Sequence, residues 1–318
     1  MKASAQAQPN IALVKYWGKR DRGRNLPAVG SLSITLGDLW TRMHVDFASA
    51  GADTLTLNGE VAPDLLPRVS RCLDAVAGPD RGPATVQSES NFPVGAGLAS
   101  SASSFAALVL ATDQAIGGGR DRLTLARLAG AASGSAARSL YGGIVELTAG
   151  EEDINLVPLS SADDWPMTVI VAVTDEGRKP VGSGDAMIAS AATSPFYSDW
   201  CARQSEDLDT ARRAVEAQDF DALGAVAEHN CLKMHSVMWT SRPPIVYWNS
   251  ATLAVMEAIR ALREDGIPVF FTIDAGPQVK AVCLPAAADS VEQTLAGVDG
   301  VVRTMRTGLG PAARILET

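Results

Sequence analysis

The chain has 318 residues, of which 47% are hydrophobic and 20% are charged, and its formal net charge is −9. These values are typical of a globular protein with one large or two modest domains. The acidic balance argues against a nucleic-acid or anionic membrane surface as the main partner. Because the chain has neither a run of about 18 apolar residues nor the apolar core of a secretion signal, we expect a cytoplasmic protein.

The first half of the chain alternates strand-like and helix-like segments. Short alternating runs of apolar and polar residues predict strands, and Asn58-Gly59 predicts the tight turn of a hairpin. Apolar residues at helical spacing predict helices. The predicted strands begin near residue 10 and cover 31–36, 42–47, 55–61, 84–88 and 144–147, and the predicted helices cover 65–76, 105–116 and 123–131.

The second half begins after a segment rich in acidic residues and serine, at about 150–166, which predicts a boundary between domains 1–165 and 166–318. Long helices dominate this half. The mixture of hairpins and helices favours an α+β fold over a doubly wound parallel sheet. The predicted strands are 167–173, 269–273 and 279–284, and the predicted helices are 198–217, 219–235, 247–263 and 287–296.

Residues 91–104 form a Gly- and Ser-rich turn that runs into an apolar helix. Amide groups at a helix start lack partners and lie at the positive end of the helix dipole, so they favour phosphate. Gly95 and Gly97 allow the backbone to approach an anion. The segment is not a P-loop, because no Gly-Lys-Ser/Thr follows the glycines, and it is not the fingerprint G-x-G-x-x-G, because Ser100 occupies the third glycine position. A tight loop with close helix packing would give the same local pattern. Hydroxyl groups for phosphate or a metal come from Ser100, Ser101, Ser103 and Ser104.

The cysteines and histidines show no metal-ligand spacing. The scattered cysteines are expected to be reduced thiols packed in the interior. His229 and His235 are six residues apart and do not share a helix face, so we expect no zinc site. The residues concerned are Cys72, Cys201, Cys231, Cys283, His44, His229 and His235.

Three further polar clusters follow predicted strands or precede predicted helices. The first spans residues 10–21, the second spans residues 133–143, and the third surrounds Asp274 in the sequence Asp-Ala-Gly-Pro. Together with the Gly/Ser turn they closely resemble the diphosphomevalonate decarboxylases of the GHMP kinase superfamily. The matching runs are Asn-Ile-Ala-x-x-Lys-Tyr-Trp-Gly-Lys-Arg-Asp from residue 10, Ala-Gly-Leu-Ala-Ser-Ser-Ala from residue 96, and Ser-Gly-Ser-Ala-x-Arg-Ser-Leu-Tyr-Gly-Gly from residue 133.

The resemblance keeps the same order from residue 9 to about residue 280. It implies a ribosomal-protein-S5-like N-terminal domain that carries the ATP loop and a ferredoxin-like C-terminal domain. The implied reaction converts mevalonate 5-diphosphate and ATP into isopentenyl diphosphate, CO2, ADP and phosphate, with Mg2+ as the metal. A homodimer is also implied, without a nucleic-acid or membrane partner.

Four residues would carry the chemistry: Asp274, Arg138 and Lys15 at the substrate, and Ser101 at the ATP phosphates and the metal. The resemblance implies that Asp274 takes the proton of the substrate's tertiary hydroxyl, although an Asp in such a turn can simply cap its own backbone. Arg138 would grip the substrate carboxylate with a planar fork that a lysine lacks, although a surface ion pair would also explain it. Lys15 would support Asp274 or the transferred phosphate.

The other site residues are also assigned by the resemblance. Trp17 would form the wall of the site, and Asn10 would orient the carboxylate or a water. Ser133 and Ser135 are expected at the start of one helix. Both could cap that helix or bind phosphate oxygens of the substrate. The diphosphate ligands would be Lys19, Arg138, Tyr16, Ser135 and Ser194. The ATP phosphates would be held by Gly95, Gly97, Leu98, Ala99, Ser100 and Ser101, with Ser101 also on the metal.

The chain departs from the family pattern at Ala137, usually Cys, at Gln278, usually Asn, and at Val94-Gly95, usually Thr-Ala. Three alternatives stay open. One is a decarboxylase of mevalonate 5-phosphate, another is a GHMP-type mevalonate 3-kinase that does not decarboxylate, and the third is a non-catalytic nucleotide-binding protein. The diphosphate is favoured by Tyr16, Lys19, Ser135 and Arg138, and decarboxylation by Lys15 and Asp274.

Overall fold

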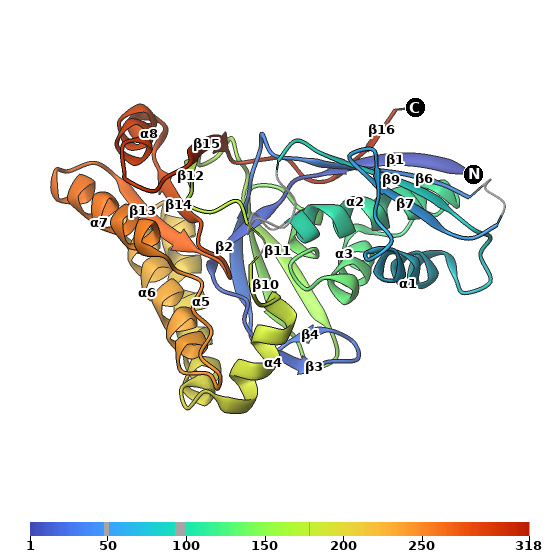
Figure 1. The fold of residues 1–318 in the computed structure, drawn as a ribbon, viewed down its shortest axis with the longest axis horizontal. Helices are drawn as coiled ribbons and strands as arrows, with labels where there is room; N and C mark the ends of the chain where they lie inside the picture. Colours follow the sequence, from blue (N-terminus) through green and yellow to red (C-terminus); the bar gives the residue numbers. More distant parts are fainter. Residues whose placement is uncertain (48–50, 93–99, 178, 318) are drawn as a thin grey trace.

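The computed structural model describes residues 1–47, 51–92, 100–177 and 179–317. It has two lobes joined by a central sheet (Figure 1). The first lobe is a six-stranded sheet covered on one face by helices α1 (Leu66–Ala77), α2 (Ser100–Ala115) and α3 (Arg122–Ala132). In order across the sheet, its strands are β16 (Arg314–Leu316), β1 (Lys2–Ala7), β6 (Thr41–Asp46), β9 (Thr85–Ser90), β7 (Thr54–Leu57) and β8 (Glu60–Val61).

The pattern of side chains in β6 explains why this sheet has helices on one face. Met43 and Val45 are buried against the helices, whereas Arg42 is exposed and His44, between them, is only partly buried. Such alternation is expected for a strand with one covered face. Helix α2 is buried on most of its surface, including Leu108 and Val109 at its centre, which explains why its sequence has no polar stripe.

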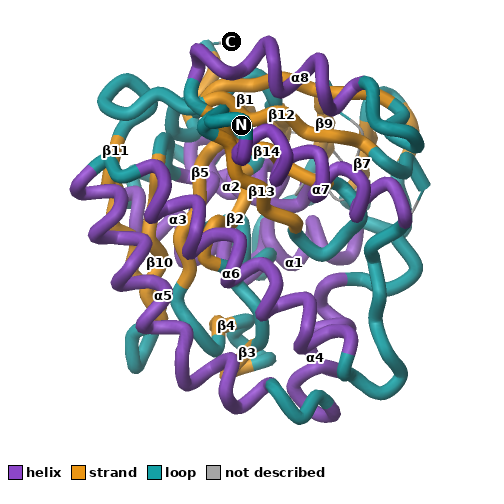
Figure 2. The backbone as a smooth tube through the Cα atoms, turned by 90° about the vertical axis from the view of Figure 1, so that its left-hand side faces the viewer, coloured by secondary structure: helices purple, strands orange, loops and turns teal. Residues whose placement is uncertain are grey.

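The central sheet has the order β11 (Ile154–Ser160), β10 (Ile144–Ala149), β5 (Ser31–Thr35) and β2 (Asn10–Val14). A two-stranded ribbon of β3 (Lys19–Asp21) and β4 (Leu26–Pro27) follows β2. The ribbon and α4 (Ser183–Thr193) lie at the same end of the molecule in both views (Figures 1 and 2). This arrangement brings the end of β2 to the junction of the two lobes.

The second lobe is a four-stranded sheet with helices on both faces. In β12, Val169 and Val171 face the core formed with α5, α6 and the central sheet. Ile170 and Ala172 face the opposite core, which contains residues of α7 and α8. Because both faces are covered, the strand is apolar throughout. The strands are β13 (Val269–Ile273), β14 (Val279–Cys283), β12 (Thr168–Val173) and β15 (Arg303–Gly308), and the helices are α5 (Tyr197–Ala217), α6 (Phe220–Trp239), α7 (Ser250–Glu264) and α8 (Ala288–Ala296).

The α+β class predicted from the sequence is confirmed. The hairpin at Asn58-Gly59 is also confirmed, with φ values of 50° and 87° that a two-residue turn requires. The division into domains 1–165 and 166–318 stays a prediction. The segment 150–166 contains the strand β11, which pairs with β10, and the C-terminal β16 pairs with β1 of the first lobe. The last strand of the proposed second domain, β16, is therefore part of the six-stranded sheet of the first lobe.

Several elements were not predicted. They are β1, β3, β4, β11, α4, β15 and β16. Strand β1 has the sequence Lys-Ala-Ser-Ala-Gln-Ala, which is poor in the β-branched and aromatic residues that mark strands, so its pairing with β6 and β16 decides its structure. None of the helices in the described part of the chain is long and apolar enough to cross a membrane.

Candidate active site

A cleft of about 660 Å³ lies where the two lobes meet. Its lining comes from the end of β2, the turn after α3, the start of α4 and the residues that follow β13. Among the described residues, six lining side chains are cationic and one, Asp274, is acidic. Since the whole chain has a net charge of −9, this concentration of cations predicts an anionic ligand. The cations are Lys15, Lys19, Arg22, Arg68, Arg138 and Lys179.

The single acid is paired with a buried lysine. Lys15 Nζ donates to Asp274 Oδ1 at 2.8 Å, and Lys280 Nζ lies 3.5 Å from Asp274 Oδ2. Burial opposes the negative charge, but the cations of Lys15, Lys280 and Arg138 outweigh it and hold the pKa of Asp274 well below its usual range. Asp274 is therefore an ionised acceptor at neutral pH.

The backbone of Lys15 is held by the second lobe. Its N–H donates to Asn230 Oδ1 at 2.7 Å, and its carbonyl oxygen accepts from Gln204 Nε2 at 2.7 Å. Asn230 also donates to Gln204, so the two amides form one network between α5 and α6. This network fixes Lys15 at the lobe junction although it belongs to the first polar cluster.

Arg138 is almost completely buried, at 2% exposure, beside the cleft. Its Nε and Nη2 donate to Asn10 Oδ1 at 3.2 and 3.1 Å, and its Nη1 donates to Ser31 Oγ at 2.7 Å. Burial lowers its pKa to about 10, so it stays charged at neutral pH. A guanidinium has five N–H groups, and these three hydrogen bonds leave two for a ligand.

The expected helix start at Ser133 and Ser135 is wrong. Helix α3 ends at Ala132, Ser133 is its C-cap, and the following short 3-10 turn η1 (Arg138–Leu140) carries Arg138. Both serines nevertheless line the cleft. Asn10 Nδ2 donates to the carbonyl oxygen of Ser135 at 2.9 Å, so Asn10 joins this turn to Arg138.

Tyr16, Trp17 and Lys19 all line the cleft and form one wall of it. The Tyr16 hydroxyl is buried and has no hydrogen-bond partner among the described residues. Burial raises the pKa of Tyr16 to about 12, so this hydroxyl stays protonated and can donate. Burial, together with neighbouring Arg68, lowers the pKa of Lys19. Trp17 is buried, and its carbonyl oxygen accepts from Trp200 Nε1 at 3.1 Å, consistent with a wall residue.

Of the Gly/Ser turn, residues 91–92 and 100–104 are described. Ser100 and Ser101 begin α2 and line the cleft, and Ser133 Oγ donates to Ser101 Oγ at 3.3 Å. Ser103 is buried against Thr41, and Ser104 Oγ donates to the carbonyl oxygen of Ser100 at 2.8 Å. These last two hydroxyls therefore serve the fold. The remaining residues predicted to bind ATP, Gly95, Gly97, Leu98 and Ala99, lie outside the described residues.

Ser194 does not line this cleft. It is the C-cap of α4, and its hydroxyl bonds Thr240 Oγ1 at 2.7 Å. Conversely, the structure adds Arg68 and Lys179. Lys179 Nζ donates to Ser183 Oγ at 2.7 Å and to the carbonyl oxygen of Ala275 at 3.1 Å. Arg68 lies on an amphipathic helix and Lys179 in a loop, so their sequence context does not mark them as site residues.

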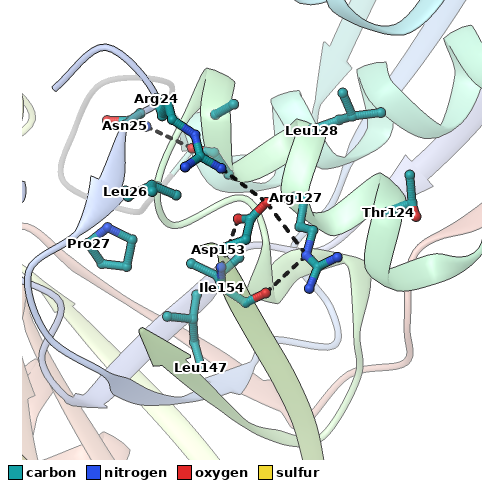
Figure 3. A pocket seen from close by; sticks show the side chains of 13 residues that line it. Arg24, Asn25, Leu26, Pro27, Thr124, Arg127, Leu128, Leu147, Asp153 and Ile154 are labelled. Atoms are coloured by element: carbon teal, nitrogen blue, oxygen red, sulfur yellow. Dashed lines mark hydrogen bonds and ion pairs between the residues drawn. The ribbon is translucent and has the colours of Figure 1, made fainter. Parts of the chain in front are cut away.

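A second cavity of about 390 Å³ shares Asn25 and Gly134 with the lining of the cleft. Figure 3 shows the residues that line it. Its charged groups satisfy one another, since Asp153 lies 3.7 Å from both Arg24 and Arg127. Arg127 Nε also donates to the carbonyl oxygen of Ile154 at 3.1 Å. Because its charge is largely neutralised and its volume is smaller, the lobe junction is the better candidate for an active site.

Side chains of the types that bind metals are dispersed in the described part of the chain. No group of three or more His, Cys, Asp or Glu side chains could hold an ion there. Three cysteines, Cys72, Cys231 and Cys283, are buried, and Cys201 is partly exposed.

Comparison with known proteins gives matches over both halves of the chain. The diphosphomevalonate decarboxylase-like N-terminal domain matches residues 7–157, and the mevalonate 5-diphosphate decarboxylase C-terminal domain matches residues 169–308. The diphosphomevalonate decarboxylase of Candida albicans is 31% identical over 97% of this chain and 96% of its own length. The phosphomevalonate decarboxylase of Haloferax volcanii is 33% identical over 100% of this chain and 98% of its own length.

A solved complex of the protein MDDEF with MVAPP, AMPPCP and magnesium has a TM-score of 0.93 and 33% identity, covering 100% of this chain and 99% of that chain. The predicted GHMP kinase fold is thereby confirmed. With both domain matches in sequence order and relatives matched over nearly their whole lengths, the chain belongs to the diphosphomevalonate decarboxylase family.

Proposed function

We propose that this protein converts mevalonate 5-diphosphate and ATP into isopentenyl diphosphate, CO2, ADP and phosphate. The observation that carries the proposal is the meeting of Asp274, Lys15 and Arg138 in one cation-rich cleft. The complex of MDDEF with MVAPP, AMPPCP and magnesium, which is similar over the whole chain, supports the same ligands here. A homodimer and a cytoplasmic location stay predictions.

The first chemical step is phosphorylation of the C3 hydroxyl. Hydroxide is a poor leaving group, and transfer of the γ-phosphoryl group of ATP makes the oxygen able to leave. Such transfer depends mainly on positioning and on neutralisation of charge. Asp274, held ionised by Lys15 and Lys280, would accept the hydroxyl hydrogen bond and then its proton. Lys15 and Lys179 would neutralise the transferred group.

The second step removes phosphate from C3 of the substrate and releases C1, the substrate carboxylate, as CO2. The electrons of the C1–C2 bond form the C2–C3 double bond as the phosphate leaves with the electrons of its C–O bond. Arg138 would hold the carboxylate through its two remaining N–H groups, in a position set by Asn10 and Ser31. Because the guanidinium is buried, its charge is screened little by solvent.

The diphosphate would lie against the wall formed by Tyr16 and Lys19. The Tyr16 hydroxyl is a buried donor without a partner among the described residues, and such an atom is costly unless a ligand satisfies it. Ser135 and Arg68 extend the same wall. This set supplies two cations and two hydroxyl groups, which suits a diphosphate better than a single phosphate.

Ser101 and Ser133 supply hydroxyl oxygens at the end of the cleft where α2 begins. Mg2+ prefers oxygen ligands and commonly binds mainly through nucleotide phosphates, and the lack of an acidic cluster among the described residues fits that mode. Bound Mg2+ would neutralise charge on the ATP phosphates. The roles of Ser101 on the metal and of Ser100 on ATP stay predictions.

A coupled assay with purified protein tests the function. With ATP, Mg2+ and mevalonate 5-diphosphate, we expect equal amounts of ADP, CO2 and isopentenyl diphosphate. ADP without CO2 would instead indicate a kinase, and a strong preference for mevalonate 5-phosphate would indicate the other decarboxylase. ATP binding without substrate-dependent ADP release would indicate a non-catalytic protein.

The tight contact between Gly134 and Tyr16 gives a prediction for substrate binding. A Cβ atom at position 134 would lie 2.3 Å from the Tyr16 hydroxyl oxygen, so Gly134→Ala must displace Tyr16. We expect the KM for mevalonate 5-diphosphate to rise about tenfold, equal to ~1.4 kcal/mol, with a smaller change in the KM for ATP. Steady-state kinetics with each substrate varied measures both.

Gly119→Ala is the control, since a Cβ there meets nothing within 4 Å and the residue does not line the cleft. An unchanged KM for mevalonate 5-diphosphate in Gly134→Ala would contradict the placement of the diphosphate beside Tyr16.

A further inference from the structure

A lysine in an inner strand of the four-stranded sheet of the second lobe reaches the Asp274 carboxylate. Lys280 belongs to β14, which pairs with β13 on one side and with β12 on the other, and every residue of that strand is buried. Lys280 Nζ lies 3.5 Å from Asp274 Oδ2 and donates to the carbonyl oxygen of Gln278 at 3.3 Å. Burying an ammonium group in a sheet is unfavourable unless its charge is compensated.

The strand register explains how this lysine reaches the site. Lys280 lies opposite Thr272 of β13, and opposed residues of neighbouring strands project to the same face of the sheet. Thr272 Oγ1 donates to the carbonyl oxygen of Ala12 at 3.1 Å, so this face is directed toward β2. Lys15 follows β2, and Asp274 follows β13. The three side chains therefore converge from three strand segments.

The two lysines contact different oxygens of the same carboxylate. Lys15 is at 2.8 Å from Oδ1, and Lys280 is at 3.5 Å from Oδ2. The Lys15 and Lys280 side chains are each 1% exposed, whereas the Asp274 side chain is 25% exposed. Since Oδ2 itself is buried, the accessible part of this side chain lies away from Lys280. The Lys280 ammonium group beside Oδ2, together with Lys15 beside Oδ1, therefore fixes the rotation of the carboxylate about its Cβ–Cγ bond.

We propose that Lys280 is a positioning residue for the reaction, which holds the Asp274 carboxylate in the orientation that meets the substrate hydroxyl. Nothing in the polar clusters of the sequence assigned it a role, because it lies within a run of apolar strand residues. The proposal depends on the proposed function for the identity of the substrate. The contact between Lys280 and Asp274 does not depend on it.

The charge of Lys280 also affects the ionisation of Asp274. Burial favours the protonated acid, and Lys15, Lys280 and Arg138 together favour the ionised form. Removal of one of these cations should raise the pKa of Asp274, because less attraction then opposes the cost of burial. The other groups around Asp274 are Lys179, the neutral His235, whose pKa burial lowers to about 3, and Cys231, whose pKa burial raises to about 11.

The test is Lys280→Met, which keeps the length of the side chain and removes its charge. We expect kcat to fall about 100-fold, as for a reactive group displaced by about 1 Å, while both KM values change by less than about threefold. The acidic limb of the kcat–pH profile that reports protonation of Asp274 lies well below the usual range of a carboxyl group in the wild type, and it should move to higher pH in the variant because the pKa of Asp274 rises. Lys280→Arg, which keeps the charge, should restore the position of that limb.

Thr272→Val is the matched control. It changes the buried residue opposite Lys280 and removes one hydrogen bond to Ala12, but it removes no charge. We expect a lower melting temperature and an unchanged acidic limb. If the methionine variant does not fold, Lys280→Gln makes the same test. A folded, uncharged variant with wild-type kcat and a wild-type acidic limb would overturn the proposal.

A titration of the free protein separates this proposal from the proposed function. The Asp274 carboxyl signal is followed by carbon-13 NMR as the pH is lowered, and it is assigned by its loss in Asp274→Asn. A higher midpoint in Lys280→Met than in the wild type supports the contact even if mevalonate 5-diphosphate is not the substrate. Equal midpoints would overturn it even if the wild-type protein shows full decarboxylase activity.

Discussion

Asp274→Asn is expected to reduce kcat by about 1,000-fold, within the usual range for loss of a group that accepts a proton in the transition state. The amide keeps the shape of the carboxylate but removes its charge. It cannot take the hydroxyl proton, and it leaves Lys15 and Lys280 without their counter-charge. The KM for mevalonate 5-diphosphate should change little, since its diphosphate and carboxylate are assigned to other residues.

The pH dependence of the wild-type protein follows from the same carboxylate. A carboxylate whose pKa is depressed in the folded state stabilises the fold above its unfolded pKa and loses this contribution as pH falls through the folded value. Because the pKa of Asp274 lies well below its usual range, Asp274 should remain ionised at mildly acidic pH. A loss of wild-type activity near pH 6 should therefore come from another group. We expect the same fractional loss, relative to the maximum of each protein, in Asp274→Asn if its residual activity can be measured.

Glu146→Gln provides a control for loss of a buried carboxylate. Glu146 is 3% exposed and pairs with Arg212 at 2.7 Å, and it does not line the cleft. We expect this variant to have a lower melting temperature and near-normal kcat. A rate within about threefold of wild type in a folded Asp274→Asn variant would rule out Asp274 as the proton acceptor.

Arg138→Lys is expected to lower kcat/KM for mevalonate 5-diphosphate by 100-fold or more, equal to ~2.7 kcal/mol. A lysine keeps the charge but has no planar fork. It would leave Asn10 Oδ1 or Ser31 Oγ without the donors that hold them, and it could not grip a carboxylate with two parallel N–H groups. The dependence on ATP concentration should change less. Initial rates with each substrate varied measure both parameters.

Arg212→Lys is the corresponding control, because Arg212 also holds a carboxylate with two nitrogens, at 2.7 Å from each oxygen of Glu146. It lies outside the cleft. We expect only a small loss of stability. Equal kinetic effects of the two substitutions would contradict a specific contact between Arg138 and the substrate carboxylate.

The local sequence was informative where local chemistry decides the structure. The helices α1, α5, α6, α7 and α8 follow from apolar spacing, and the Asn58-Gly59 turn follows from residues that adopt positive φ without a large penalty. The polar clusters at 10–21, 133–143 and 271–277 were identified because such residues are unusual beside apolar strands. The family followed from their order along the chain.

The direction of a side chain was not predictable in the same way. Ser101 and Ser103 are two residues apart in one serine-rich run, yet the first lines the cleft and the second is buried against Thr41. Ser194 matched a family position but caps α4. Because residues two apart lie on different faces of a helix, packing of α2 on its sheet decides which hydroxyl is available.

By itself, the sequence determined the α+β class, most helices, the family and the residue types that the reaction needs. Only the tertiary structure decided that Lys15, Arg138 and Asp274 lie in one cleft, that Arg68 and Lys179 join them, and that Lys280 reaches Asp274 from the middle of a sheet. The physical reason is that the Lys15–Asp274 and Arg138–Asn10 contacts join segments more than 100 residues apart. Lys280 and Asp274 are close in the sequence, but the pairing of β13 with β14 decides that their side chains meet. Strand register and packing between the lobes set such contacts, and neither is encoded in any short stretch of the chain.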